Sequence, residues 1–191
     1  MSKDIFNDHH EADLPENEDQ LVRQSQADPA AFGPLFDHYA PRVYRYALHR
    51  VGTVADAEDI TSRTFTDALQ SLNRYRPSRN GSFGGWLFTI ARRRCVDLYR
   101  APVSLPLSLF DLQDKTSGPV DEAIAKDNQR RLEGILKELT DKEQELLRLR
   151  FAGELTYREI GDILGKSEAA AKMSLTRLIK RMRILWEEKD G

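Results

Sequence analysis

Basic side chains gather near the C-terminus, in a stretch whose apolar residues recur at helical spacing. From Lys166 to Arg183 there are six basic residues and one acidic residue, Glu168. Apolar side chains recur every three or four residues from Ala171 to Trp186, which predicts a helix with one face toward a core. Basic and small polar side chains on the opposite face suit the base edges of the major groove and the flanking phosphates. The residues on that face or at its edges are Lys172, Met173, Ser174, Thr176, Arg177, Lys180 and Arg181.

Two helix starts and a glycine turn would position this basic helix. Thr156 with Glu159 three residues later forms a capping box, which predicts a helix that starts at Tyr157 and stops at Gly165. Ser167 is the N-cap candidate of the basic helix, whose first backbone amides could hold a phosphate. The pattern predicts a helix-turn-helix that reads duplex DNA. A solvated amphipathic helix in a helical bundle is the alternative interpretation.

A second basic segment mixes arginines with aromatic and turn-forming residues. Residues 69–100 contain seven arginines and one acidic residue, Asp97, and residues 74–86 predict a loop before a helix over about 85–99. Phosphates accept hydrogen bonds from arginine and unstacked bases stack on aromatic rings, so the pattern predicts a surface for single-stranded nucleic acid. The alternative is that the apolar residues are core and the arginines are solvated. The candidate contact residues are Arg79, Asn80, Gly81, Ser82, Trp86, Arg92 and Arg93.

The charge distribution divides the 191 residues into four segments. Residues 1–19 carry one basic and seven acidic side chains, residues 20–100 twelve and seven, residues 101–122 one and four, and residues 123–191 fifteen and thirteen. The net charge of −2 therefore hides two basic blocks. We expect an all-α protein with two small helical domains, 20–100 and 123–191. An acidic disordered tail would precede them, and a flexible linker without helical periodicity would join them at 101–122.

Local signals place further helices in both domains. Asp28 is an N-cap candidate for a helix that Pro41 should kink or split. The next helix is amphipathic, and Leu69 is expected on its inner face. In the second domain, Thr140 and Glu143 form another capping box, opening a helix that supports the basic one.

Several function classes are not supported. The single cysteine, Cys95, excludes an intramolecular disulfide and favours a reducing compartment, where it would be a small buried hydrophobe. His9 and His10 are adjacent but lack further clear ligands, so no metal site is expected. No phosphate-binding loop, nucleophile elbow or cofactor motif is present, and we expect neither an enzyme nor a bound cofactor. The chain has no run of eighteen apolar residues and no targeting peptide pattern, so a cytoplasmic protein without membrane insertion is predicted.

Four segments in this order together resemble the extracytoplasmic-function (ECF) class of bacterial sigma factors. They are FDHYAPRVYRY at 36–46, DAEDI at 56–60, FGGWLFTIAR at 83–92 and LTYREIGDILG at 155–165. The resemblance covers about residues 20–100 and 123–186. It implies a transcription initiation factor with no enzymatic activity of its own, in which sigma domain 2 opens the −10 promoter element and sigma domain 4 reads the −35 element as duplex.

The resemblance also implies partners. Core RNA polymerase would bind the helix beginning at Asp56 through the clamp helices of its largest subunit, with Asp56, Asp59, Ser62 and Arg63 as contact residues. The loop over 79–82 would capture an unstacked −10 base, and the linker would run through the polymerase. An anti-sigma factor is expected as a restraining partner, and promoter DNA as the target.

Five residues in three segments depart from the pattern of the family. Ser62 and Arg63 stand where Gln and Glu are frequent, and Arg93 stands where Asn is frequent. Met173 and Ser174 replace a frequent Ser-Arg pair, so the sequence preferred at the −35 element cannot be inferred from that of relatives. Two alternatives therefore stay open: a helix-turn-helix DNA-binding regulator that acts without core polymerase, and an adaptor that has kept the fold but lost promoter melting.

Overall fold

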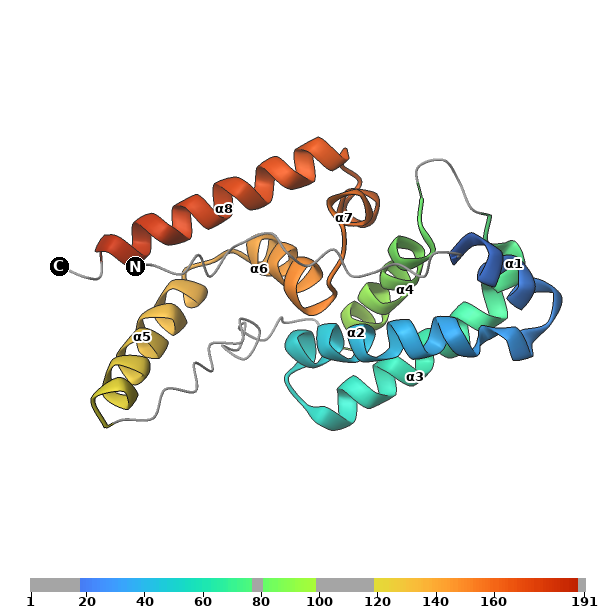
Figure 1. Ribbon diagram of the computed structural model, residues 1–191, viewed down its shortest axis with the longest axis horizontal. Coiled ribbons are helices and arrows are strands. Elements are labelled where there is room, and N and C mark those ends of the chain that lie inside the picture. The colour runs from blue at the N-terminus through green and yellow to red at the C-terminus, as the bar shows by residue number, and fades with distance from the viewer. Residues whose placement is uncertain (1–17, 77–80, 99–118, 189–191) are drawn as a thin grey trace.

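The computed structural model describes residues 18–76, 81–98 and 119–188, and within this part the chain forms two helical bundles (Figure 1). This confirms the predicted all-α class. None of the helices among the described residues is both long and apolar enough to span a membrane. The elements of the first bundle are α1 (Glu18–Ala27), η1 (Pro29–Phe32), α2 (Gly33–Val51), α3 (Val54–Ser71), η2 (Leu72–Arg74) and α4 (Phe83–Leu98). Those of the second are α5 (Pro119–Lys137), α6 (Asp141–Leu147), η4 (Arg148–Ala152), α7 (Tyr157–Leu164) and α8 (Glu168–Glu188).

An aromatic core holds the first bundle together and fixes where α4 begins. Tyr39 and Tyr46 of α2 are fully buried, and α3 and α4 pack against this helix. Phe83, the first residue of α4, has its ring centroid 5.5 Å from that of Tyr39 and 6.1 Å from that of Phe32. Such tilted and edge-to-face pairs add to the free energy gained by burial. The segment that leads into α4 is therefore anchored to a rigid core.

Several sequence predictions for this bundle need correction. Helix α2 is not split at Pro41, because the buried side chains on both sides of it favour one continuous helix. Helix α1 begins at Glu18, inside the predicted tail, and the Glu18 carboxylate accepts a hydrogen bond from the Tyr39 hydroxyl. Leu69 is exposed rather than inward, because it lies about 100° further round α3 than the buried Ala68. The structure does not describe residues 1–17 of the predicted tail.

The second bundle forms as the capping signals predict. Both capping boxes are present, at Thr140 before α6 and at Thr156 before α7. Gly165 ends α7 in the left-handed conformation with φ 65°, and the Ser167 hydroxyl accepts a hydrogen bond from the Ala170 amide at 3.2 Å. Helix α5 begins at Pro119, within the predicted linker, because proline suits the first turn of a helix. Residues 99–118 of that linker lie outside the described part.

The backbone of α7 passes close to the turn that precedes α8, and this sets how the two helices of the helix-turn-helix cross. A Cβ atom on Gly161 would lie 2.7 Å from the carbonyl oxygen of Lys166, so only glycine lets α7 pass this close to the turn. The stripe Ala171, Leu175 and Leu178 of α8 is buried, as predicted. Helix α8 is therefore held by its apolar face, with its opposite face exposed.

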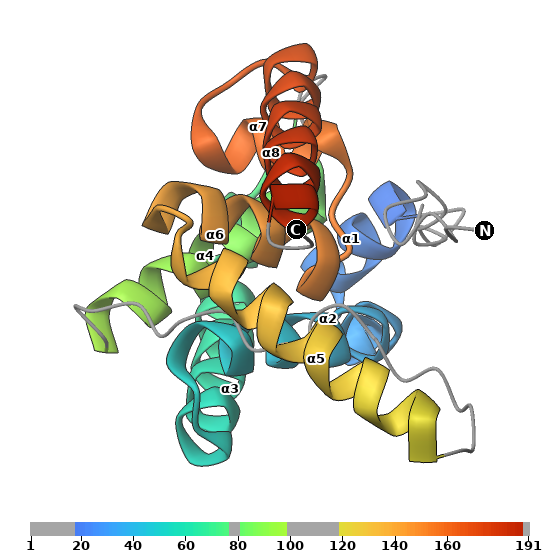
Figure 2. The ribbon, with the colours of Figure 1, turned by 90° about the vertical axis from the view of Figure 1, so that its left-hand side faces the viewer.

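The two bundles are in contact. Helix α6 and the π-helical turn η4 lie between α8 and α2 in both views (Figures 1 and 2). Contacts join α2 to η4 and α4 to α7. Helix α7 of the second bundle thus lies against α4 of the first bundle, the helix that follows the predicted single-strand loop.

Candidate nucleic-acid interfaces

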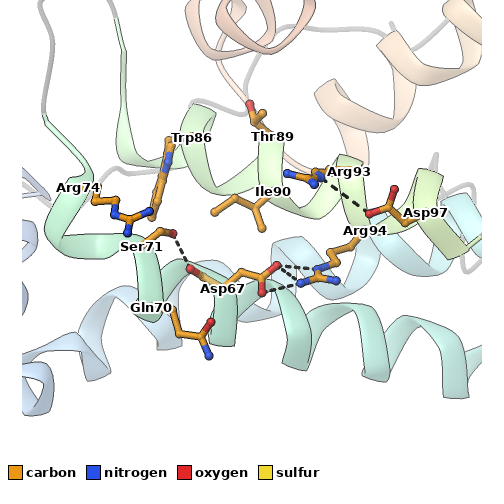
Figure 3. Close-up of a pocket in the computed structure, with 10 residues that line it drawn as sticks. All are labelled: Asp67, Gln70, Ser71, Arg74, Trp86, Thr89, Ile90, Arg93, Arg94 and Asp97. Atoms are coloured by element: carbon orange, nitrogen blue, oxygen red, sulfur yellow. Dashed lines mark hydrogen bonds and ion pairs between the residues drawn. The ribbon is translucent and has the colours of Figure 1, made fainter.

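A groove of about 560 Å³ lies between the C-terminal half of α3 and helix α4 (Figure 3). The Trp86 ring stands on one side of it, beside the Arg74 side chain, and Ile90 projects toward its centre. Trp86 is held by the rings of Tyr75 and Phe83, at centroid distances of 4.9 and 5.4 Å. A fixed indole beside guanidinium groups can stack a base while the cations hold phosphates. The groove therefore has the chemistry of a single-strand site.

An ion pair closes one wall of this groove. The Arg94 guanidinium donates two hydrogen bonds to the Asp67 carboxylate, Nε to Oδ2 and Nη2 to Oδ1, both at 2.6 Å. This bidentate pair joins α4 to α3 and fixes the separation of the two helices. Arg93 lies on the same helix with 84% of its side chain exposed, 3.9 Å from Asp97. Arg93 is thus the more available cation for a phosphate.

Arg74, Asp67 and Arg94 are not among the contact residues predicted from the sequence. Arg74 lies in the predicted loop motif, and its basic charge beside an aromatic run was the signal that could have identified it. Asp67 and Arg94 are 27 residues apart on different helices, so no local spacing indicates their pairing. Only the packing of α3 on α4 brings them together.

The predicted −10 residues fall in different surroundings. Arg79 and Asn80 lie outside the described residues. The Ser82 hydroxyl accepts a hydrogen bond from the Gly85 amide at 3.0 Å and donates one to Glu159 at 3.0 Å, so Ser82 caps α4. Trp86 and Arg93 both line the groove, whereas the nearest acidic partner of Arg92 is Glu145 of α6, at 3.3 Å.

On the exposed face of α8, backbone carbonyls accept the hydroxyl hydrogens of two polar side chains. The Ser174 hydroxyl donates to the Ala170 carbonyl at 2.8 Å, and the Thr176 hydroxyl donates to the Lys172 carbonyl at 3.0 Å. The Met173 side chain is 52% exposed. This part of the face therefore presents methyl and thioether groups, which can contact the methyl group of thymine.

Cations flank that apolar part of α8. Arg177 and Lys180 are exposed. The Lys172 ammonium lies 5.7 Å from the centroid of the Tyr157 ring, and the Arg181 guanidinium donates to Glu143 of α6 at 2.5 Å. Arg177 and Lys180 are thus available to DNA, whereas contact by Arg181 requires it to leave or share the Glu143 carboxylate.

The acidic face of α3 is partly paired within the helix itself. The Asp56 carboxylate accepts a hydrogen bond from Thr53, the N-cap residue, at 2.5 Å. Asp59 and Arg63 form an i,i+4 ion pair with an N–O distance of 2.8 Å, in which the Arg63 side chain is largely exposed and the Asp59 side chain is partly exposed. Ser62 is exposed beside them. Arg63 therefore neutralises a carboxylate on the face predicted to dock the polymerase.

Comparison with known proteins decides the family. The sigma-70 region 2 family matches residues 35–102, and the sigma-70 region 4 family matches residues 135–183. The chain is 30% identical over 160 residues to the ECF RNA polymerase sigma factor RpoE of Cereibacter sphaeroides, a match that spans 81% of this chain and 88% of RpoE. The chain belongs to the ECF sigma factors.

Two further comparisons agree with this family. The sigma factor is 33% identical over 168 residues to the ECF sigma factor BldN of Streptomyces coelicolor, and it spans 63% of the length of BldN. It shares its fold with CnrH, solved in complex with the cytosolic domain of CnrY, with a TM-score of 0.60 and 20% identity over 90% of this chain and 97% of that chain. In this sigma factor the region 2 match spans most of α2 and all of α3 and α4, and the region 4 match spans α6, α7 and most of α8.

Proposed function

We propose that this sigma factor binds core RNA polymerase and directs initiation at promoters whose −10 element it melts and whose −35 element it reads. The proposal is supported by two surfaces of different chemistry in one ECF chain. One is the groove with Trp86 and Arg93, which suits an unpaired strand, and the other is the exposed face of α8, which suits a duplex. A factor that opens one element and reads another needs both.

At the −10 element, the groove and the preceding loop would both contact the unpaired strand. Extruding a base costs a few kcal/mol, which stacking and binding to the polymerase can supply. Arg79, Asn80 and Gly81 would hold the base, Trp86 would stack a neighbouring base, and Arg93 would bind phosphate. Ser82 supports them by capping α4, which fixes the direction in which Trp86 projects.

At the −35 element, α8 would enter the major groove with its N-terminal half. Arg177 would contact base edges and Lys180 a phosphate, since both are exposed on the same side of the helix. Met173 and the methyl group of Thr176 would contact thymine. The amides that follow Ser167 would hold a phosphate and fix the register of the helix.

The remaining parts of the proposal concern partners and location. Helix α3 would dock the clamp helices of the largest polymerase subunit through Asp56, Asp59 and their neighbours Ser62 and Arg63. An anti-sigma factor would restrain the sigma factor, and CnrH, which shares the fold, was solved in complex with another protein, the cytosolic domain of CnrY. We infer that the protein acts in the cytoplasm without catalysis of its own.

Reconstitution with core polymerase tests this function. Transcript starts mapped after overexpression should share an upstream motif, and a template that carries this motif should give a run-off transcript only when both core enzyme and this protein are present. Duplex binding without any polymerase-dependent transcript would refute the proposal, because it would indicate a regulator that acts without core enzyme.

A further inference from the structure

Helix α1 precedes the region 2 match, which begins at residue 35, yet it packs against elements that form the groove of Trp86. The Val22 and Ser25 side chains of α1 are buried, and contacts join this helix to η2 and to α4. None of the residues that line the groove belongs to α1. Helix α1 therefore supports the groove without lining it.

One side chain of α1 connects it to the turn η2. The Gln26 amide group donates from Nε2 to the Leu72 carbonyl at 2.9 Å and to the Tyr75 carbonyl at 2.8 Å. Leu72 is the first residue of η2 and Tyr75 follows its last residue, so a single amide group spans the whole turn. Two hydrogen bonds from one half-buried side chain thus fix the position of η2 relative to α1.

Tyr75 depends on this backbone hydrogen bond for its position. Arg76 also donates to the Tyr75 carbonyl, at 2.9 Å, but Arg76 is the next residue in the chain and its side chain is exposed. The Tyr75 hydroxyl is buried and has no hydrogen-bond partner in the described part of the chain. The polar end of the ring therefore does not hold Tyr75, whose position is set by packing and by the hydrogen bond from Gln26.

The Tyr75 ring in turn supports Trp86. The Tyr75 side chain is 8% exposed, and its ring lies edge to face against Phe83 at a centroid distance of 5.8 Å. Its centroid lies 4.9 Å from that of Trp86, with an angle of 41° between the two rings. Because closely packed rings leave little free space, a shift of the Tyr75 backbone would also move the surface on which the indole rests.

We propose that Gln26 is a positioning residue for the −10 element, because its amide group holds Tyr75, and Tyr75 holds Trp86 in the orientation that stacks an unpaired base. This inference rests on the proposed function and adds a residue of α1 to it. Since Gln26 does not line the groove, its effect on DNA binding should be coupled to the one base that Trp86 stacks.

A nearly isosteric substitution removes the two hydrogen bonds. Gln26→Glu keeps the length and shape of the side chain but places a carboxylate, which has no donor, against two carbonyl oxygens. Gln24→Glu is the matched control, because it makes the same change of charge in the same helix at an exposed side chain. Circular dichroism should show equal helicity in the two proteins. Gln26→Leu, compared with Gln24→Leu, removes the donors without adding charge and replaces the first pair if Gln26→Glu does not fold.

Holoenzyme binding to a pre-opened bubble measures the coupling. One base at a time is removed from the −10 non-template strand, which leaves an abasic site. With the wild type and with Gln24→Glu, removal of the stacked base should weaken binding on the order of tenfold, the size of one base–aromatic stack. With Gln26→Glu, as with Trp86→Ala, the same removal should weaken binding by less than about threefold, because the stack is already lost.

The outcomes distinguish positioning from a general defect. Equal sensitivity of Gln26→Glu and the wild type at that base would overturn the positioning role, because a purely structural defect weakens all templates by the same factor. Loss of the sensitivity in Gln24→Glu as well would also overturn it, since the effect would then follow from charge alone. Wild-type binding that depends on no single −10 base would instead refute the stacking role of Trp86 in the proposed function, and with it the role of Gln26.

Fluorescence of the free protein tests the positioning of Trp86 without polymerase or DNA. Trp86 and Trp186 are the two tryptophans of the chain, so Trp86 is the only reporter in a Trp186→Phe background. Gln26→Glu should shift the Trp86 emission to the red and increase its quenching by acrylamide relative to Gln24→Glu, because the indole loses its fixed contact with Tyr75. Identical emission and quenching in the two variants would overturn the inference, whatever the outcome of the binding experiment.

Discussion

Acidification should destabilise the folded protein through His49, which is only 8% exposed beneath the domain contact. Burial, followed by the nearby charges of Arg148 and Arg45, lowers the pKa of His49 from 6.5 to about 4. A depressed pKa means that the folded state disfavours the protonated imidazole. The contribution of the neutral His49 ring to the unfolding free energy is therefore fully present above about pH 6.5. It is lost as the pH falls toward 4.

The size of this loss follows from the pKa difference. The full shift corresponds to about 3.4 kcal/mol of unfolding free energy at ~1.36 kcal/mol per pKa unit. At about pH 5 the folded ring is still mostly neutral while the unfolded ring is mostly charged, so about 2 kcal/mol should be lost relative to about pH 7.5. The pKa of His38 is also lowered, by burial and then by Arg42, which adds to the loss in the same direction.

Urea unfolding followed by circular dichroism at the two pH values measures this effect. The wild type should lose about 2 kcal/mol more than His49→Gln, which carries no titrating group at that position. His38→Gln should keep the His49 part of the loss and serves as the matched control. Equal pH dependence of the wild type and His49→Gln would refute the assignment to His49.

The remaining predictions concern the proposed interfaces. Asp59→Arg should abolish co-purification with core polymerase while helicity is unchanged, since it reverses the charge of the docking face. Asn80→Ala should reduce transcription from duplex promoters far more than from a pre-opened bubble, and equal loss on both templates would indicate a fold defect. Arg177→Ala should cost roughly 1–3 kcal/mol at one −35 base pair, whereas Lys180→Ala should weaken all sequences and lower the salt slope by about one. Replacing thymine by uracil in the −35 element removes a methyl group, and at one position this should weaken binding of the wild-type holoenzyme but not of the Met173→Ala holoenzyme. If no such replacement weakens wild-type binding, this contact is refuted.

Local signals in the sequence determined where α6 and α7 of the second domain begin and where α7 ends. Thr156 and Glu159 cap α7 because a helix fixes the separation of residues three apart, whatever surrounds it. Gly165 ends the helix because glycine adopts positive φ without strain. The all-α class, the helix-turn-helix and the exposed face of α8 follow from such short-range rules and from apolar periodicity.

Contacts between distant segments were decided only by the tertiary structure. One wall of the groove is closed where Asp67 of α3 meets Arg94 of α4, and α7 lies against the start of α4 where Glu159 meets Ser82, 77 residues away. Each of these charged or polar residues, taken alone, is of a type that is usually solvated on a protein surface. No pattern within one helix could therefore indicate the pairing. The sequence by itself therefore determined which helices carry candidate DNA-binding side chains, whereas the packing of whole helices decided which of those side chains are exposed and which are held by the other domain.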